Sequence, residues 1–402
     1  MTSRVFISLL LVSATACARL GGSAALPGGS TETATRDIAR FKTLWEFDQS
    51  DGCAPESEPI AVGQKLYGTT SCGGRFGNGT IYTMSRHDKV RDFHDFEKDG
   101  DGPAGQLMLV GQTLYGTTYR GGKPGNGTVY SIDVATGKEL WYYSFKGAPD
   151  GANPDGGLLD VNGTLYGTTA SGGVCSSSED GCGTVFTIST SGNEQVIYRF
   201  QGGDDGAGPN GTLTNSGGTL YGTTQGGETG ETGTVFSVTS SGVERALHAF
   251  TGSANDGLYP TGNLIFSHGK LYGTTELGGT TNKGTAYSIT TTGQFKIVHS
   301  FGGIHGGDGW WPGAGLTTFN GKFFGTTDRG GDYSCSGEDG CGVVYVLKAN
   351  GDEKVIHSFT GGSGGNEPIA PLLARGRTLY GTTAEGGGGG SRNFGIIFSI
   401  KP

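Results

Sequence analysis

The pentapeptide LYGTT occupies residues 66–70, and the same string or a close variant of it returns six more times along the chain. The aromatic residues of the seven copies are Tyr67, Tyr115, Tyr166, Tyr221, Tyr272, Phe324 and Tyr380. Successive copies lie 48, 51, 55, 51, 52 and 56 residues apart. A period near 50 residues is typical of β-propeller blades, in which each repeat forms one small antiparallel sheet.

Three further features recur around the pentapeptide. A proline precedes its aromatic by 12 residues in every repeat, at Pro55, Pro103, Pro154, Pro209, Pro260, Pro312 and Pro368. A GTVYSI-like segment follows, with its aromatic at Tyr82, Tyr130, Phe186, Phe236, Tyr287, Tyr345 or Phe398. A segment that ends in Phe then follows six of these, at Phe96, Phe145, Phe200, Phe250, Phe301 and Phe359. Each repeat therefore predicts four strands, which we name A (after the proline), B (LYGTT), C (GTVYSI) and D (ending in Phe), with A innermost.

The seventh repeat stops at Pro402 without a D strand, whereas a matching segment, FKTLWEF at residues 41–47, precedes the first repeat. We therefore predict an all-β fold over residues 39–402. It is a seven-bladed propeller of four-stranded antiparallel blades, closed by the N-terminal strand as the outer strand of the last blade. The 81 glycines among 402 residues agree with this fold, because an interior glycine costs a helix about 1 kcal/mol.

The first 16 residues have the composition of a secretory signal peptide. An apolar run at residues 5–12 follows Arg4, and three small residues precede Cys17. We expect a signal peptide at 1–16 and a flexible tether at 17–38. Lipidation of Cys17 makes the protein an outer-membrane lipoprotein, attached to the membrane by its N-terminal lipid alone. In the alternative, Cys17 is not lipidated, and the protein is secreted to the periplasm or the exterior.

The other six cysteines form three local pairs, and the exported context favours disulfides over metal ligands. The expected disulfides are Cys53 with Cys72, Cys175 with Cys182, and Cys335 with Cys341. No further cysteine pair or histidine stands at zinc-ligand spacing, so we expect no metal site and no cofactor.

Loop lengths distinguish the two faces of the ring. The proline-to-B distance is constant and the C-to-D distance nearly so, whereas the B-to-C distance runs 15, 15, 20, 15, 15, 21 and 18 residues. The B–C and D–A loops emerge on one face, called the top, and all three cysteine pairs lie there. Because binding residues concentrate on loops carried by a rigid scaffold, we expect the site on the top face. The alternative is that these loops vary because nothing constrains their length.

The candidate ligand-binding residues lie on the top loops or face the ring axis. Trp310 and Trp311 occupy the longest D–A loop, and aromatic rings suit the faces of sugars. In the alternative, these two side chains plug the channel or pack between blades. The remaining candidates are Tyr259, His305, Asp308, Tyr119, Arg120, Arg329 and Tyr333 on the loops, and Glu58, Gln106, Thr212 and Asn263 three residues after a proline.

No catalytic residue is predicted. His94, His248, His299 and His357 each stand two residues before a D-strand Phe, and a residue type that recurs by blade indicates a structural role. The Asp-Gly pairs of the D–A loops recur in the same way, which turn formation explains. The net charge of −9 provides no basic surface, so we expect no nucleic-acid partner.

The sequence LYGTTxxGG followed by GTVYSI resembles the GloVer tandem repeat of exported bacterial proteins, and the resemblance covers residues 41–402. It implies export and surface attachment, and it transfers no catalytic residue because the family has no established activity. GTVYSIDVATGKELW (Gly127–Trp141) is more weakly similar to quinoprotein-like propeller repeats. The propeller lipoprotein of the outer-membrane β-barrel assembly machinery is a related comparison.

These observations favour an exported, non-catalytic binding module, expected to be a monomer, whose top face recognises a glycan or an envelope polymer. One alternative is a scaffold of the cell envelope with a protein partner, which an exposed apolar patch would indicate. The other is a carbohydrate-active hydrolase or lyase at the channel mouth, and a hydrolase would need two carboxylates roughly 5 to 9.5 Å apart.

Overall fold

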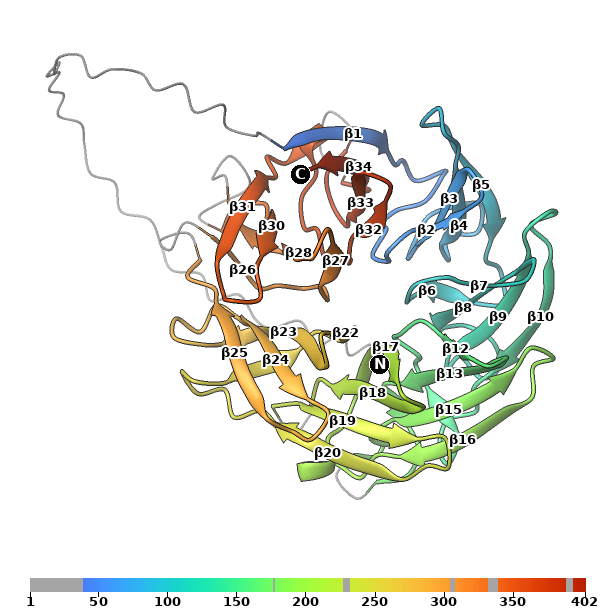
Figure 1. Cartoon of the computed structure of the whole chain (residues 1–402). Helices are drawn as coiled ribbons and strands as arrows, with labels where there is room; N and C mark the ends of the chain where they lie inside the picture. The colour runs from blue at the N-terminus through green and yellow to red at the C-terminus, as the bar shows by residue number, and fades with distance from the viewer. Residues whose placement is uncertain (1–38, 176–177, 227–231, 304–307, 332–338, 388–392) are drawn as a thin grey trace, which may run out of the picture. The chain divides into compact units, whose positions relative to one another are not determined.

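The computed structural model describes residues 39–175, 178–226, 232–303, 308–331, 339–387 and 393–402. Residues 1–38, where the signal peptide and tether are predicted, lie outside this part of the chain. A compact unit spans Ile38–Pro402 and consists of seven antiparallel blades arranged in a ring, with an additional two-stranded sheet in each of blades 3 and 6 (Figure 1). Within the described ranges, no helix is both long and apolar enough to cross a membrane.

The blades follow one another in chain order around the ring (Figure 1). Blade 1 holds β2 (Ile60–Val62), β3 (Lys65–Thr70), β4 (Thr80–Met84) and β5 (Val90–Asp95). Blade 2 holds β6 (Asp101–Pro103), β7 (Met108–Val110), β8 (Thr113–Arg120), β9 (Thr128–Asp133) and β10 (Glu139–Ser144). Blade 3 holds β11 (Gly151–Ala152), β12 (Leu159–Val161), β13 (Thr164–Thr169), β14 (Ser171–Gly172), β15 (Thr184–Ser189) and β16 (Glu194–Arg199).

Blade 4 holds β17 (Pro209–Ser216), β18 (Thr219–Thr224), β19 (Thr234–Thr239) and β20 (Glu244–Ala249). Blade 5 holds β21 (Gly257–Pro260), β22 (Ile265–Ser267), β23 (Lys270–Gly278), β24 (Thr285–Thr290) and β25 (Phe295–Ser300). Blade 6 holds β26 (Gly309–Trp310), β27 (Thr317–Phe319), β28 (Lys322–Thr327), β29 (Arg329–Gly330), β30 (Val343–Leu347) and β31 (Glu353–Ser358). The described helices are two single 3₁₀ turns, η1 (Gly203–Asp205) and η3 (Gly362–Gly364).

Blade 7 confirms the predicted closure. It holds β32 (Leu373–Arg375), β33 (Thr378–Thr383) and β34 (Ile396–Lys401), and its outer strand is β1 (Arg40–Glu46) from the other end of the ring sequence. The two end strands pair antiparallel, with Arg40 opposite Lys401 and Glu46 opposite Ile396. In Figure 1 the blue β1 lies along the dark red β34. The seven-bladed all-β architecture is therefore as predicted.

Strand A differs from the prediction in one respect. In six blades it is a three-residue strand that begins five residues after the proline, for example at Ile60 after Pro55. The intervening residues run along the ring axis outside any regular strand, except in blade 4, where β17 begins at Pro209. This extended segment forms the channel wall described below.

Two of the three predicted disulfides are present, Cys53–Cys72 and Cys175–Cys182. Cys53 and Cys72 also form a β-bridge, which joins the D–A loop to the B–C loop of blade 1 as expected. The third pair includes Cys335, which lies outside the described residues.

The core consists of buried side-chain clusters that lie between adjacent blades. Each D-strand Phe meets the C-strand aromatic of the next blade edge to face, as in Phe200 against Phe236 with ring centroids 5.0 Å apart. The same contact recurs at all seven interfaces, and Phe47 of the closing strand makes it with Tyr82. Edge-to-face aromatic pairs contribute about 0.5 to 1.5 kcal/mol beyond their buried area.

The glycine of LYGTT makes room for that aromatic ring. Gly222 is paired with Phe236 across the strands, and a Cβ atom at Gly222 would lie 2.6 Å from Cζ of Phe236. The same approach occurs at every blade, from Gly68 under Tyr82 to Gly381 under Phe398. The pentapeptide therefore recurs because the aromatic ring between blades leaves no room for a side chain at this position of the B strand.

The residue two before each D-strand Phe ties the D–A loop to the blade. In six blades this Trp, Tyr or His hydrogen-bonds an Asp of the following loop, as in Tyr143 Oη to Asp150 Oδ2 at 2.9 Å. The same Asp also accepts a backbone N–H of its own loop, for example that of Lys146. Both observations agree with a structural role for the recurring His and Asp residues.

We expect Gly222→Ala to lower the free energy of unfolding by about 2 kcal/mol, because its methyl group would overlap the buried Phe236 ring. Gly217→Asn in the same blade is the control. Gly217 has a φ of +63°, a Cβ atom there would have no neighbouring atom within 4 Å, and Asn162 and Asn320 adopt similar φ values. Denaturant unfolding of both variants measures the difference, and an equal loss of stability in the two would contradict this account of LYGTT.

Stability should fall as the pH rises through neutrality. Burial raises the pKa of Glu194 from 4.5 to about 7 and that of Glu244 from 4.5 to about 8. Because both side chains hold a proton more tightly in the folded state than in the unfolded state, their contribution is full below about pH 4.5 and is lost up to pH 7–8. Thermal unfolding between about pH 6.5 and 8.5 should show a falling midpoint. The Glu194→Gln and Glu244→Gln variants should flatten this slope, and a midpoint that rises with pH in the wild type would refute the assignment.

Candidate functional site

A cavity of about 230 Å³ lies on the ring axis, and all seven blades contribute to its wall. The first and third residues after each proline supply the wall. Those at the first position are Glu56, Ala104, Asp155, Asn210, Thr261, Gly313 and Ile369, and those at the third are Glu58, Gln106, Gly157, Thr212, Asn263, Gly315 and Pro371. Gln225 and Glu276, each directly after an LYGTT pentapeptide, complete one side.

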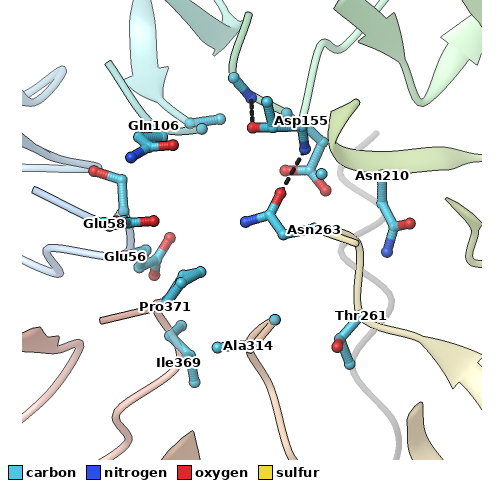
Figure 2. A pocket seen from close by; sticks show the side chains of 18 of the residues that line it. Glu56, Glu58, Gln106, Asp155, Asn210, Thr261, Asn263, Ala314, Ile369 and Pro371 are labelled. Atoms are coloured by element: carbon cyan, nitrogen blue, oxygen red, sulfur yellow. Dashed lines mark hydrogen bonds between the residues drawn. The ribbon is translucent and has the colours of Figure 1, made fainter. Parts of the chain in front are cut away.

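Figure 2 shows how these side chains face one another across the cavity. Glu56, Glu58 and Gln106 lie on one side, and Asn210, Asn263 and Thr261 lie opposite. The polar surface is therefore spread over blades 1 to 5, whereas blades 6 and 7 contribute Ala314, Ile369 and Pro371.

Hydrogen bonds between blades fix the backbone of this wall. The N–H of Gly157 donates to Thr212 Oγ1 at 3.0 Å, and the N–H of Thr212 donates to Asn263 Oδ1 at 2.6 Å. The first threonine of the pentapeptide contributes as well, since Thr117 Oγ1 donates to the carbonyl of Gly156 at 2.8 Å. These contacts hold the wall in place before any ligand arrives.

The cavity is acidic. Glu56, Glu58, Asp155 and Glu276 line it, and no Lys, Arg or His is among its described lining residues. Burial away from water raises the pKa of Glu58 to about 8, that of Asp155 to about 6 and that of Glu276 to about 7. Near pH 7 the wall therefore carries negative charge at Asp155, together with a Glu58 carboxyl that is mostly protonated and able to donate a hydrogen bond.

The residue before each proline adopts a positive φ in all seven blades. Two are glycines, Gly102 and Gly208, and the other five are Ala54, Asn153, Tyr259, Trp311 and Glu367. Their N–H groups donate to a carbonyl of the preceding blade, as Trp311 does to Lys283 at 3.1 Å. A non-glycine residue in this conformation costs about 1 to 2 kcal/mol, so five blades keep a side chain where glycine would cost less.

Two of these side chains are candidate aromatic residues. Tyr259 and Trp311, with φ of 56° and 55°, are half-buried. Trp310, in contrast, is buried in β26 with Nζ of Lys283 3.7 Å from its ring centroid, and Trp311 stands edge-on to it at 5.0 Å. The structure therefore places Trp310 between blades 5 and 6, which was the alternative considered for it.

The other candidates on the loops lie in different surroundings. Asp308 is buried and bonded to His299 and to the N–H of Gly302, both at 2.9 Å. Arg329 pairs with Glu367 at 2.8 Å and lies 3.4 Å from Asp328. Arg120 is exposed beside the half-buried Tyr119. His305 and Tyr333, like Cys17, lie outside the described residues.

Glu58, Gln106, Thr212 and Asn263 were the candidates predicted to face the axis, and all four line the cavity. The first-position residues were not among the predicted candidates, although they have the same signal. Residues one and three after the proline share a face of an extended segment, so the rule that identified Glu58 also identifies Glu56 and Asp155. Gln225 and Glu276 follow LYGTT directly and were missed because that motif was treated as structure alone.

Comparison with solved structures finds propellers of low sequence identity. A chain of a mitotic checkpoint complex has a TM-score of 0.53 at 11% identity, over 95% of this chain and 98% of that one. A europium-containing methanol dehydrogenase has a TM-score of 0.50 at 12% identity, over 88% and 87%. BamB from Moraxella catarrhalis has a TM-score of 0.48 at 13% identity, over 85% and 82%. At this identity the first two show the fold alone.

No curated protein matches the chain. The sequence model of the Gloeobacter/Verrucomicrobia repeat, however, matches residues 22–179 and 174–337, which together make up most of the chain. The expected GloVer relationship is thereby confirmed. Two disulfides and this exported repeat indicate an extracellular or envelope location, and the propeller indicates a binding or scaffold module. The chain belongs to the Gloeobacter/Verrucomicrobia repeat family.

Proposed function

We propose that this protein is an envelope or extracellular binding module that takes a neutral or amine-bearing glycan at the top mouth and central cavity of its propeller. One observation carries the proposal: the cavity wall presents carboxyls, amides and hydroxyls from five blades and no basic side chain among its described residues. Sugar hydroxyls both donate and accept hydrogen bonds, and this wall offers both kinds of partner.

The charge of the cavity selects among polymers. Asp155 repels phosphates, sulfates and uronates, since no Lys, Arg or His is among the described lining residues. An amine-bearing sugar, in contrast, meets carboxylates at hydrogen-bond range. Anionic envelope polymers are therefore poor candidates, and neutral or amino-sugar chains are good ones.

In this proposal Tyr259 and Trp311, each two residues before a wall residue of the cavity, supply the apolar contact that sugar recognition uses. Tyr259 and Trp311 are half-buried planar groups held by backbone bonds to the preceding blade, so they lose little freedom on binding. The conformational cost of a positive φ at both positions supports a role for these side chains beyond packing.

A protein scaffold is the second candidate. Leu140 and Tyr142 lie on β10, an outer edge strand, and are 56% and 45% exposed. Adjacent exposed apolar residues on a sheet edge suit a protein partner better than a sugar.

The test is calorimetric titration of the full chain with three classes of oligosaccharide: neutral β-glucan or chitin fragments, chitosan fragments, and alginate fragments. We expect saturable binding of a neutral or amine-bearing chain and none of alginate. Trp311→Gly and Asp155→Asn should each weaken binding about tenfold or more. Glycine at position 311 removes the ring while accepting the positive φ, so the fold should persist.

Tyr142→Ala, on the outer edge strand, is the matched control and should bind like the wild type. If none of the oligosaccharides binds while the fold is intact, the glycan proposal is wrong. Binding that persists in Trp311→Gly and Asp155→Asn would overturn the assigned site. Reducing-end or unsaturated products in the same samples would favour the hydrolase or lyase alternative.

A further inference from the structure

At four blade interfaces, a third residue lies beside the recurring pair of a D-strand Tyr or His and the Asp of the following loop. The first residue of the next D strand is a Glu there, and the clusters are His94–Asp99–Glu139, Tyr143–Asp150–Glu194, Tyr198–Asp205–Glu244 and His299–Asp308–Glu353. Two clusters have a tyrosine and two have a histidine in the same structural position. Comparing the tyrosine clusters with the histidine clusters shows which position a ligand could occupy in the histidine clusters.

In the tyrosine clusters the phenol oxygen lies between the two carboxyl groups. Tyr143 Oη is 2.9 Å from Asp150 Oδ2 and 3.0 Å from Glu194 Oε2. Tyr198 Oη likewise contacts Asp205 at 2.5 Å and Glu244 at 3.4 Å. One hydroxyl thus bridges an aspartate of one blade to a glutamate of the next.

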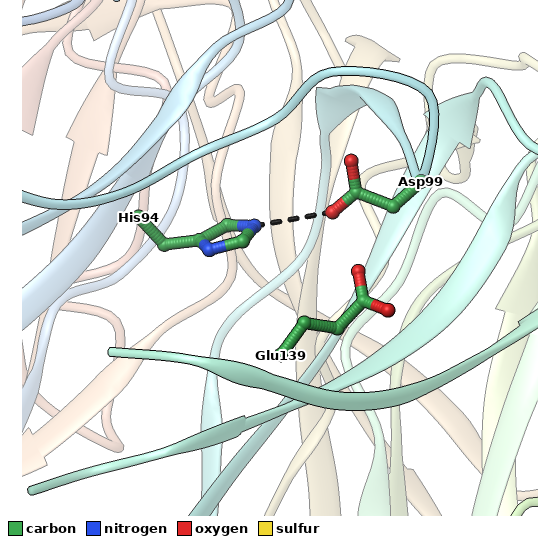
Figure 3. Close-up of side chains that lie close together, drawn as sticks. All are labelled: His94, Asp99 and Glu139. Atoms are coloured by element: carbon green, nitrogen blue, oxygen red, sulfur yellow. Dashed lines mark hydrogen bonds and ion pairs between the residues drawn. The ribbon is translucent and has the colours of Figure 1, made fainter. Parts of the chain in front are cut away.

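In the histidine clusters the ring is shorter and reaches only the aspartate. His94 Nε2 lies 3.1 Å from Asp99 Oδ2, and His299 Nε2 lies 2.9 Å from Asp308 Oδ2. Figure 3 shows the carboxyl group of Glu139 facing the His94–Asp99 pair. In each cluster one ligand atom from every residue lies within 4.8 Å of the other two.

A metal ion bound to imidazole lies about 2.0–2.1 Å beyond the nitrogen. This places the ion at roughly the reach of a phenol oxygen from the same backbone position. An ion on Nε2 would therefore take the bridging place that Oη takes in the tyrosine clusters, with one oxygen from Asp and one from Glu completing three protein ligands.

Two further observations support a ligand at these positions. Oε1 of Glu353 is buried and has no hydrogen-bond partner among the described residues, as is also the case for Oε1 of Glu194 and Glu244, whose other carboxyl oxygen contacts the tyrosine hydroxyl. In addition, each aspartate is oriented before binding: Asp99 Oδ1 accepts the N–H of Glu97 at 2.9 Å, and Asp308 Oδ1 accepts that of Gly302 at 2.9 Å. Such outer contacts fix ligating groups in metal sites.

We propose that the two histidine clusters, His94–Asp99–Glu139 and His299–Asp308–Glu353, are binding sites for a divalent transition-metal ion that links adjacent blades. One imidazole and two carboxylates suit Zn²⁺ or a similar borderline ion. The chain itself provides controls, because His248 bonds Asp256 in the same way but has Phe295 stacked on it where the other clusters have Glu.

The experiment is a calorimetric titration of chelator-treated full chain with Zn²⁺, repeated with Co²⁺ while its visible absorption is followed. We expect two equivalents bound per chain, one after His94→Tyr or His299→Tyr, and none after both changes. Tyrosine is this protein's own residue at the equivalent position, so these variants should fold. Zn²⁺ should raise the unfolding temperature of the wild type and leave that of the double variant unchanged.

The reverse substitution supplies a gain of binding. Tyr143→His places an imidazole beside Asp150 and Glu194 and should raise the stoichiometry from two to three. His248→Tyr should leave it at two, because that cluster has no second carboxylate. The proposal is overturned by fewer than one equivalent of Zn²⁺ in the wild type, or by unchanged binding in the His94→Tyr, His299→Tyr double variant.

Discussion

The contact between a D-strand Phe, the C-strand aromatic of the next blade and the glycine beneath that aromatic is the element on which the ring depends. Phe200, Phe236 and Gly222 show it within one interface. The core clusters of the described residues combine side chains of two adjacent blades, so each blade completes its core with a neighbour. The seven copies form a ring because β1 completes blade 7, and the ring in turn creates the axial cavity and the two loop-bearing faces.

Features that recur at every blade interface could be predicted from the sequence, whereas features of a single blade were harder to predict. The proline, LYGTT and Phe repeats predicted blade number, strand order and closure, because each serves an interface that occurs seven times. Glu58 and Asn263 were predicted because each lies three residues after the proline of its blade. Asp155 was missed, although it directly follows the proline of its own blade and also lines the cavity. Whether a loop tryptophan such as Trp310 faces solvent or a neighbouring blade depends on tertiary packing, which no spacing in the sequence reports.

Departures from the repeat identify the places where individual blades have specialised. Positions that follow the repeat, such as the buried threonines of LYGTT, bond between strands or blades. The residues before the prolines keep one backbone conformation but carry Ala, Asn, Tyr, Trp, Glu or Gly. A constant backbone with variable side chains is the arrangement that binding proteins use to change ligands without changing fold. The acidic wall residues and the aromatic residues Tyr259 and Trp311 before two of the prolines are variations of this kind.

The pairing of β1 with β34 also sets an order of events in biosynthesis. Arg40 is made early and must wait for Lys401, a partner 361 residues away, before the ring can close. Contacts between such distant residues form late, and the early strand keeps an open edge in the meantime. Blades 1 to 6 can take shape as they are synthesised, but the ring can close only after β34 has appeared. A chain that ends before β34 would therefore hold most of its blades in a ring that cannot close.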